Sequence, residues 1–179
     1  NQSRRQRQMC IRDRYYQLIY GIDIAVGMIL DELEKQEIAD NTIVIYTTDN
    51  GYSTGAHGFG GKVLPYEEAS RGPLLIYAPG TKSEGKKWRS KALVGNIDMA
   101  PTILDAAGLK IPKHMDGKSL LKIMNKKNAI VKDHQAIIQT WGENQTHSLS
   151  IVSDNYKYLY WFYGEGMDCL LYTSPSPRD

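Results

Sequence analysis

Residues 42–62 read TIVIYTTDNGYSTGAHGFGGK, and this stretch decides the fold. Its first part, Thr42–Thr48, is rich in β-branched and aromatic residues, which is typical of a buried strand in a parallel sheet. We expect the strand to end at Asp49-Asn50-Gly51, where a glycine-rich loop carrying His57 and Lys62 begins. Because open α/β sheets bind ligands outside the carboxyl ends of their strands, this loop is the first candidate for a site.

The side chains at the start of the loop are suited to a hard cation. Asp49 offers a carboxylate and Asn50 an amide oxygen, and such ligands suit Ca²⁺ or Mg²⁺ better than Zn²⁺. Gly51 permits a sharp turn, after which Lys62 could approach an anion held by the metal. Asp-Asn-Gly is also a common β-turn composition, so on these three residues alone an ordinary turn stays open.

The residues that follow the loop extend the pattern. Tyr66-Glu67-Glu68 comes next, then Arg71, then the apolar run Leu74–Ala78, introduced by a proline. In this order the elements closely resemble the second half of the catalytic domain of type I sulfatases, a family of the alkaline phosphatase superfamily. The resemblance implies an α/β fold. Its central, mostly parallel sheet is flanked by helices, and a small antiparallel sheet follows at the C-terminal end.

Two later segments fit the same family. Residues 98–108, DMAPTILDAAG, resemble its D-x-x-P-T-L-L-x-x-A-G helix, and residues 114–121, HMDGKSLL, resemble the x-x-D-G-x-S-L turn that follows. Asp98 is expected to cap the helix at its start, and Gly108 suits its C-terminal cap. Both segments are structural in the family, so they predict the fold and add no chemistry.

The resemblance implies hydrolysis of a sulfate ester of a carbohydrate or an aryl alcohol. In the family, a cysteine or serine in a C/S-x-P-x-R motif is oxidised to formylglycine, which attacks sulfur while a divalent metal, usually Ca²⁺, withdraws charge from the sulfate. Carried over, Asp49 and Asn50 are metal ligands, with Ca²⁺ expected and Mg²⁺ as the alternative. Lys62 contacts the sulfate, and His57 lies close by in the catalytic loop.

The nucleophile motif does not occur in these 179 residues. Residues 174–178, SPSPR, come nearest, but Ser176 stands where the motif needs proline. Two ligands also cannot complete a Ca²⁺ shell of about six to eight oxygens. We therefore expect the chain by itself to be inactive and to bind metal weakly.

Both ends of the chain resemble translated sequencing-adapter DNA. This interpretation makes residues 1–14 and 169–179 artefact tails. Residues 15–125 are then the C-terminal part of the catalytic domain, and 126–168 the start of the antiparallel subdomain. Setting aside the six arginines and two aspartates of the tails leaves 16 basic and 18 acidic residues, a net charge of −2. That charge favours neither nucleic acid nor a membrane as a partner.

The tails also contain both cysteines, so the compartment cannot be inferred from cysteine use. A periplasmic or extracellular location follows from the family resemblance alone. No sequence feature predicts the oligomeric state.

The remaining pattern predicts one long helix and a hairpin. Tyr15–Glu37 carries an apolar stripe, and Asp23 lies near it as an acid expected to be buried with a partner. Gln135–Trp141 and Ser148–Tyr163 are predicted strands, the second one folded at Asp154-Asn155. Its alternating aromatic residues are expected to pack rather than to stack on sugar rings. We expect the isolated chain to expose a sheet edge and an apolar face, and so to aggregate.

Two other functions compete with sulfate hydrolysis. A phosphonate or phosphodiester hydrolase of the same superfamily would share the metal loop, but such enzymes often have Asp-His where this chain has Asp49-Asn50, which favours sulfate. A non-catalytic binding protein on a degenerate sulfatase scaffold is the rival from another class. An intact nucleophile motif in the longer protein would exclude the binding protein.

Overall fold

The computed structural model describes residues 2–62, 64–86, 88–127, 129–131, 134–141, 146–153, 155–161 and 169–173. Its α-helices are α1 (Gln2–Lys35), α2 (Glu67–Ser70), α3 (Met99–Ala106) and α4 (Leu121–Asn125). Short 3₁₀ turns are η1 (Ala39–Asn41), η2 (Ala56–Gly58) and η3 (Asn96–Asp98). The strands are β1 (Val44–Thr47), β2 (Leu74–Tyr77), β3 (His134–Trp141), β4 (Thr146–Ser153), β5 (Tyr156–Trp161) and β6 (Cys169–Thr173).

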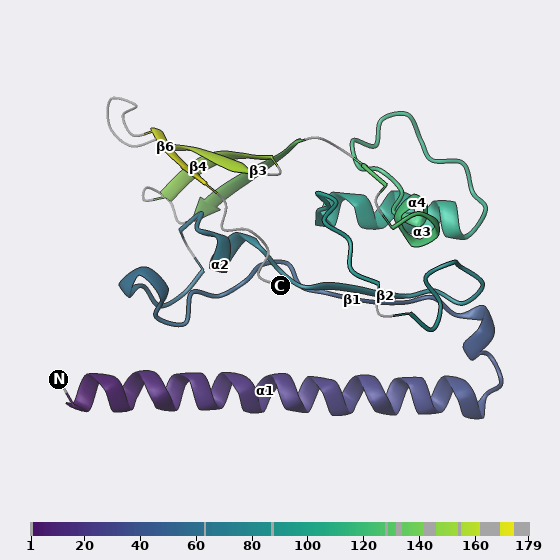
Figure 1. Ribbon diagram of the computed structural model, residues 1–179, viewed down its shortest axis with the longest axis horizontal. Helices are drawn as coiled ribbons and strands as arrows, with labels where there is room; N and C mark the ends of the chain where they lie inside the picture. Colours follow the sequence, from purple (N-terminus) through teal and green to yellow (C-terminus); the bar gives the residue numbers. More distant parts are fainter. Residues whose placement is uncertain are drawn as a thin grey trace.

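Strands β1 and β2 form a two-stranded sheet at the centre of the molecule (Figure 1). They pair antiparallel, with Val44 opposite Tyr77 and Thr47 opposite Leu74, so the expected parallel neighbour is not among the described strands. Strand β1 is half-buried and Thr47 is exposed, so the prediction of a buried strand is wrong for the described part of the chain. The strand ends before Asp49, as predicted.

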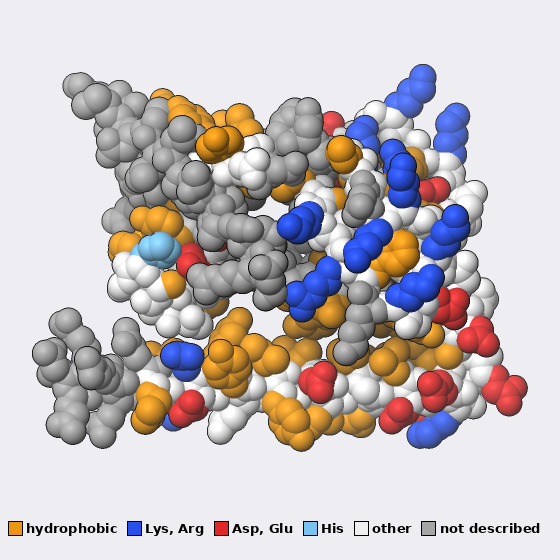
Figure 2. All heavy atoms as spheres, viewed as in Figure 1, with side chains coloured by type: hydrophobic (Ala, Val, Ile, Leu, Met, Phe, Trp, Pro, Cys, Tyr) orange, Lys and Arg blue, Asp and Glu red, His pale blue; other side chains and the backbone are white. Residues whose placement is uncertain are grey.

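Helix α1 lies along one side of the molecule and forms a separate layer (Figure 1). It begins earlier than predicted and ends two residues sooner, at Lys35. Its apolar side chains are largely exposed, with Leu18 at 69% and Ile29 at 56%, and they line the helix on the face seen in Figure 2. Asp23 is exposed, so its predicted burial is wrong, and this part of the helix is open on both sides of it, with Ile22 and Ile24 at 43% and 49% exposure. No helix in the described residues has the length and apolarity needed to cross a membrane.

The core joins β2 to the helices that follow it. Ala78, Leu120 and Met124 are buried together, and seven partly buried apolar side chains pack against them: Leu74, Ile76, Val94, Met99, Leu121, Ile123 and Val131. Figure 1 shows α3 and α4 next to each other, on the side of the β1–β2 sheet opposite to α1. The chain that leads into α4 passes close to η3, because a Cβ at Gly117 would overlap the carbonyl oxygen of Ile97.

Asp98 holds these segments together. Its side chain is fully buried, and its Oδ2 accepts a hydrogen bond from the Gly95 backbone N–H at 2.8 Å. Its Oδ1 accepts one from the Lys118 N–H, also at 2.8 Å. The carboxylate therefore caps η3, just before α3, and ties it to the segment before α4. It makes no side-chain capping hydrogen bond to α3, so the predicted cap of that helix is wrong, whereas a structural role for Asp98 is confirmed. Helix α3 ends as predicted, with Gly108 in the left-handed region at φ 70°.

Asp98→Asn is expected to lower the free energy of unfolding by about 2 kcal/mol, because an amide NH₂ would face one of the two buried N–H donors. Asp116→Asn is the matched control, since Asp116 is exposed. Urea unfolding followed by circular dichroism measures both changes. Equal stability of the two variants would contradict a structural role for the Asp98 carboxylate.

The C-terminal strands form a four-stranded antiparallel sheet in the order β3-β4-β5-β6, which confirms the predicted hairpin. The buried face of β5 carries Lys157 and Leu159, at 0% and 1% exposure. Tyr156 and Tyr158 are 54% and 39% exposed, so the predicted packing of the aromatic face is wrong for these two tyrosines. Residues of both presumed tails lie within α1 and β6. Secondary structure does not bear on their origin, and the tail interpretation stays a prediction.

Candidate active site

The candidate site begins at the turn that follows β1. The Gly51 N–H donates to the Ala69 carbonyl oxygen at 2.8 Å, which fixes the turn against α2. A Cβ at Gly51 would overlap the Glu68 carbonyl oxygen and lie 2.9 Å from that of Arg71. Gly51 is thus required for the close approach of two backbones, and its φ is not in the left-handed region.

The glycine-rich loop closes on itself and returns the chain to this turn. The Ser53 N–H donates to the Gly61 carbonyl oxygen at 2.8 Å, and the Gly55 N–H donates to that of Phe59 at 2.9 Å. Gly55, Gly58 and Gly61 all have positive φ, which glycine adopts without strain. Closure of the loop places Lys62 beside the Asp49-Asn50 turn, although twelve residues separate Lys62 from Asn50.

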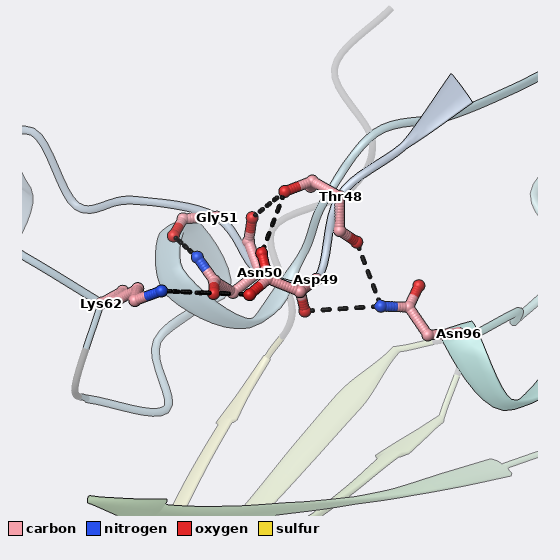
Figure 3. A network of polar contacts seen from close by, with 6 residues as sticks. All are labelled: Thr48, Asp49, Asn50, Gly51, Lys62 and Asn96. Carbon is pink, nitrogen blue, oxygen red and sulfur yellow. Dashed lines mark hydrogen bonds and ion pairs between the residues drawn. The ribbon is translucent and has the colours of Figure 1, made fainter.

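Lys62 contacts both predicted metal ligands. Its Nζ donates to Asn50 Oδ1 at 2.9 Å and lies 3.9 Å from Asp49 Oδ2. The Asp49 side chain is 80% exposed and that of Lys62 is 40% exposed, so the three polar ends meet at an open surface. Figure 3 shows Lys62 approaching the turn from one side. The structure thus brings together Asp49, Asn50 and Lys62, the group that the sequence predicted.

Two further polar residues hold the turn, and neither was predicted. The Thr48 hydroxyl lies 3.0 Å from the Asn50 carbonyl oxygen and 3.3 Å from Asp49 Oδ1. From the opposite side to Lys62, Asn96 Nδ2 donates to the Thr48 carbonyl oxygen at 3.1 Å (Figure 3). Asn96 lies 48 residues after Thr48, and no spacing rule in the sequence connects them. The Asp49 side chain remains 80% exposed with these contacts in place.

His57 belongs to a neighbouring cluster. Its Nε2 lies 3.3 Å from Glu68 Oε2, and its ring stacks on Tyr66 at a centroid distance of 4.5 Å. Its own backbone is left-handed, with φ 54°. Glu68 belongs to α2, the helix that holds Gly51, so His57 and the turn share a support. Among the described contacts of His57, none joins it directly to Asp49, Asn50 or Lys62.

The oxygen ligands in the turn are of the type that a hard cation prefers, but they are too few to form a complete metal site. Asp49 and Asn50 supply a carboxylate and an amide oxygen, and the ammonium of Lys62 already lies where positive charge is favoured. Within the described residues, no group of three or more histidine, cysteine, aspartate or glutamate side chains could hold a metal ion. A Ca²⁺ ion needs about six to eight oxygens, so further ligands would have to come from elsewhere.

The Sulfatase family model matches residues 2–109, and the chain therefore belongs to the sulfatase family. The chain is 39% identical over 117 residues to the N-acetylglucosamine-6-O-sulfatase of Bacteroides thetaiotaomicron, covering 65% of this chain and 20% of the relative. It is 32% identical over 166 residues to the arylsulfatase of Clostridium perfringens, covering 92% of this chain and 34% of the relative. The chain thus spans about a third or less of the length of these relatives.

Solved structures confirm the predicted fold class. One protein, determined in complex with its substrate D-glucosamine-2-N,6-O-disulfate, superposes with a TM-score of 0.79 at 29% identity. The match covers 87% of this chain and 32% of that protein. The chain therefore has part of the α/β sulfatase fold, with the candidate site at the carboxyl end of β1.

Proposed function

We propose that this chain is a segment of an enzyme that hydrolyses the sulfate ester of a carbohydrate or an aryl alcohol. Its membership of the sulfatase family supports sulfate ester hydrolysis in general. The contact of Lys62 with Asn50 and Asp49 carries the proposal for the site, because it gathers a cation and two hard oxygen ligands at the end of β1. The sugar and aryl sulfatases among the relatives support both substrate classes.

The proposed roles follow from the charges at the turn. Asp49 and Asn50 would hold a divalent cation, Ca²⁺ in preference to Mg²⁺, together with oxygens from the rest of the protein. Such a cation supplies charge withdrawal from the sulfate oxygens. Lys62 would then turn from Asn50 to the sulfate and stabilise the negative charge of the transition state. His57, held by Glu68, lies on the same loop and is the candidate to contact the leaving oxygen.

The nucleophile of the proposed reaction is a formylglycine made from a C/S-x-P-x-R motif that these 179 residues do not contain. The chain by itself is therefore proposed to be inactive, and the experiments below on catalysis use the full-length protein that contains it. The same experiments test phosphonate and phosphodiester substrates, for which Asn50 in place of histidine is the less expected ligand.

Asp49→Ala in the full-length enzyme is expected to raise the Ca²⁺ concentration needed for half-maximal activity by about 100-fold, because the turn after β1 loses its charged ligand. The measurement removes metal with a chelator and then titrates Ca²⁺ back into a sulfate-release assay.

Asp40→Ala is the matched control for this titration, since Asp40 is exposed in η1, outside the turn. An unchanged Ca²⁺ requirement in the Asp49 variant would remove Asp49 from the metal site. If both variants hydrolyse the ester after the metal has been removed, the reaction does not need a metal ion, and the proposed metal site is wrong.

A further inference from the structure

A buried lysine from the C-terminal sheet reaches the helix behind the candidate site. The Lys157 side chain is fully buried on β5, and its Nζ lies 2.5 Å from Ser70 Oγ, to which it donates. The same Nζ donates to Glu67 Oε1 at 3.3 Å, and the Glu67 side chain is only 16% exposed. Both partners belong to α2, almost ninety residues earlier in the chain.

The pKa of Lys157 is lowered overall, so the contacts with α2 offset only part of the cost of burying this charge. Burial lowers the pKa of Lys157, while the charges of Glu67 and Glu68 and the hydrogen bond to Glu67 raise it. A buried ammonium without partners would be strongly unfavourable, so β5 and α2 are held in one relative position as long as the lysine is charged. Leu159, on the same face of β5, is also buried. Lys157 therefore fixes where the sheet meets the helix.

Helix α2 in turn determines the shape of the turn at the site. Gly51 donates its N–H to Ala69, and it packs against the carbonyl oxygens of Glu68 and Arg71 without space for a Cβ. Glu68 also contacts His57 at 3.3 Å. A shift of α2 would therefore move both the Asp49-Asn50-Gly51 turn and the support of His57.

We propose that Lys157 is a positioning residue for the active site: through Glu67 and Ser70 it fixes α2, and α2 fixes the turn that carries Asp49 and Asn50. That this turn is an active site rests on the function proposed above. The link from Lys157 through α2 to the turn does not. The C-terminal sheet thereby contributes to the site from a distance, through one buried charge.

Amide hydrogen exchange of the full-length protein that contains this chain tests this link. Residues 49–53 contain two bonded amides, those of Gly51 and Ser53, and residues 118–120 contain two others, those of Lys118 and Leu120. Lys157→Met is expected to increase the exchange rate of residues 49–53 by about tenfold, because this segment is hydrogen-bonded to α2. The exchange rate of residues 118–120 is expected to change by less than about twofold. Mass spectrometry of peptic peptides reads both segments in one sample.

Lys122→Met is the matched control, since Lys122 is exposed on α4, and it is expected to leave both segments unchanged. Unchanged exchange in 49–53, or an equal increase in both segments, would overturn the proposal, because the second result describes general loss of stability. If Lys157→Met does not fold, Ser70→Ala is compared in the same way and is expected to raise exchange in 49–53 alone. Equal exchange in that variant and the unmodified chain would also overturn it.

Exchange is measured without metal or substrate. A protein that fails to hydrolyse sulfate esters but shows the selective change in 49–53 would therefore retain the positioning role of Lys157 and lose only the proposed reaction.

Discussion

Gly51→Ala is expected to destabilise the protein by about 3 kcal/mol, at the upper end of the usual cost of overpacking, because the methyl group would meet backbone atoms rather than a flexible side chain. The new methyl group would overlap the Glu68 carbonyl oxygen and crowd that of Arg71. Neither atom can move without distorting α2. Urea unfolding measures the loss, and an increased exchange of residues 49–53 would locate it at the turn.

Gly60→Ala provides the control in the same loop. A Cβ there meets no atom within 4 Å, and Gly60 does not have a positive φ. Its effect is expected to stay within about 1 kcal/mol, with stabilisation where the unfolded chain loses freedom. Equal losses of stability in the two variants would contradict this expectation. They would show that the close contact of Gly51 with α2 does not set the cost of adding a methyl group.

Lys62→Met is expected to lower kcat for sulfate ester hydrolysis by about 10²–10³-fold in the full-length enzyme, because removal of one preorganised charge from a transition state has effects of that size. Methionine keeps the length and apolar stem of lysine, so the loop that ends at Lys62 should keep its fold. The measurement is steady-state kinetics with an aryl sulfate and a sulfated sugar.

Lys82→Met is the control for the loss of a positive charge, since Lys82 is exposed in the loop after β2. Its kcat is expected to equal that of the unmodified enzyme. A Lys62 variant with kcat within about threefold of normal would exclude Lys62 from contact with the transition state, since such contacts give larger effects.

Local sequence order predicted much of the candidate site. The sequence shows a strand that ends in Asp49-Asn50-Gly51 and a glycine-rich loop after it. Gly55, Gly58 and Gly61 have positive φ, which closes the loop and brings Lys62 back to the turn. Helix α3 was equally readable from the segment between Asp98 and Gly108. In both cases residues near in sequence determine the geometry.

Contacts between distant segments could not be predicted in this way. Asn96 reaches the turn from 48 residues away, and Lys157 reaches Glu67 across 90 residues. In the sequence, Lys157 only alternates with aromatic residues. The position of α2, which supplies its partners Glu67 and Ser70, makes its face of β5 the buried one. The exposure of Asp23 and the antiparallel pairing of β1 with β2 likewise depend on which segments lie opposite them.

We propose that the end of β1 belongs to the active site of a metal-dependent sulfate ester hydrolase. The most direct test measures sulfate released by the full-length protein from an aryl sulfate and from N-acetylglucosamine 6-sulfate, with a phosphonate monoester and a phosphodiester in parallel. We predict sulfate release that a chelator abolishes, that Ca²⁺ restores and that Lys62→Met reduces. Faster cleavage of the phosphorus esters, or no cleavage of any ester with an intact protein, would contradict the claim.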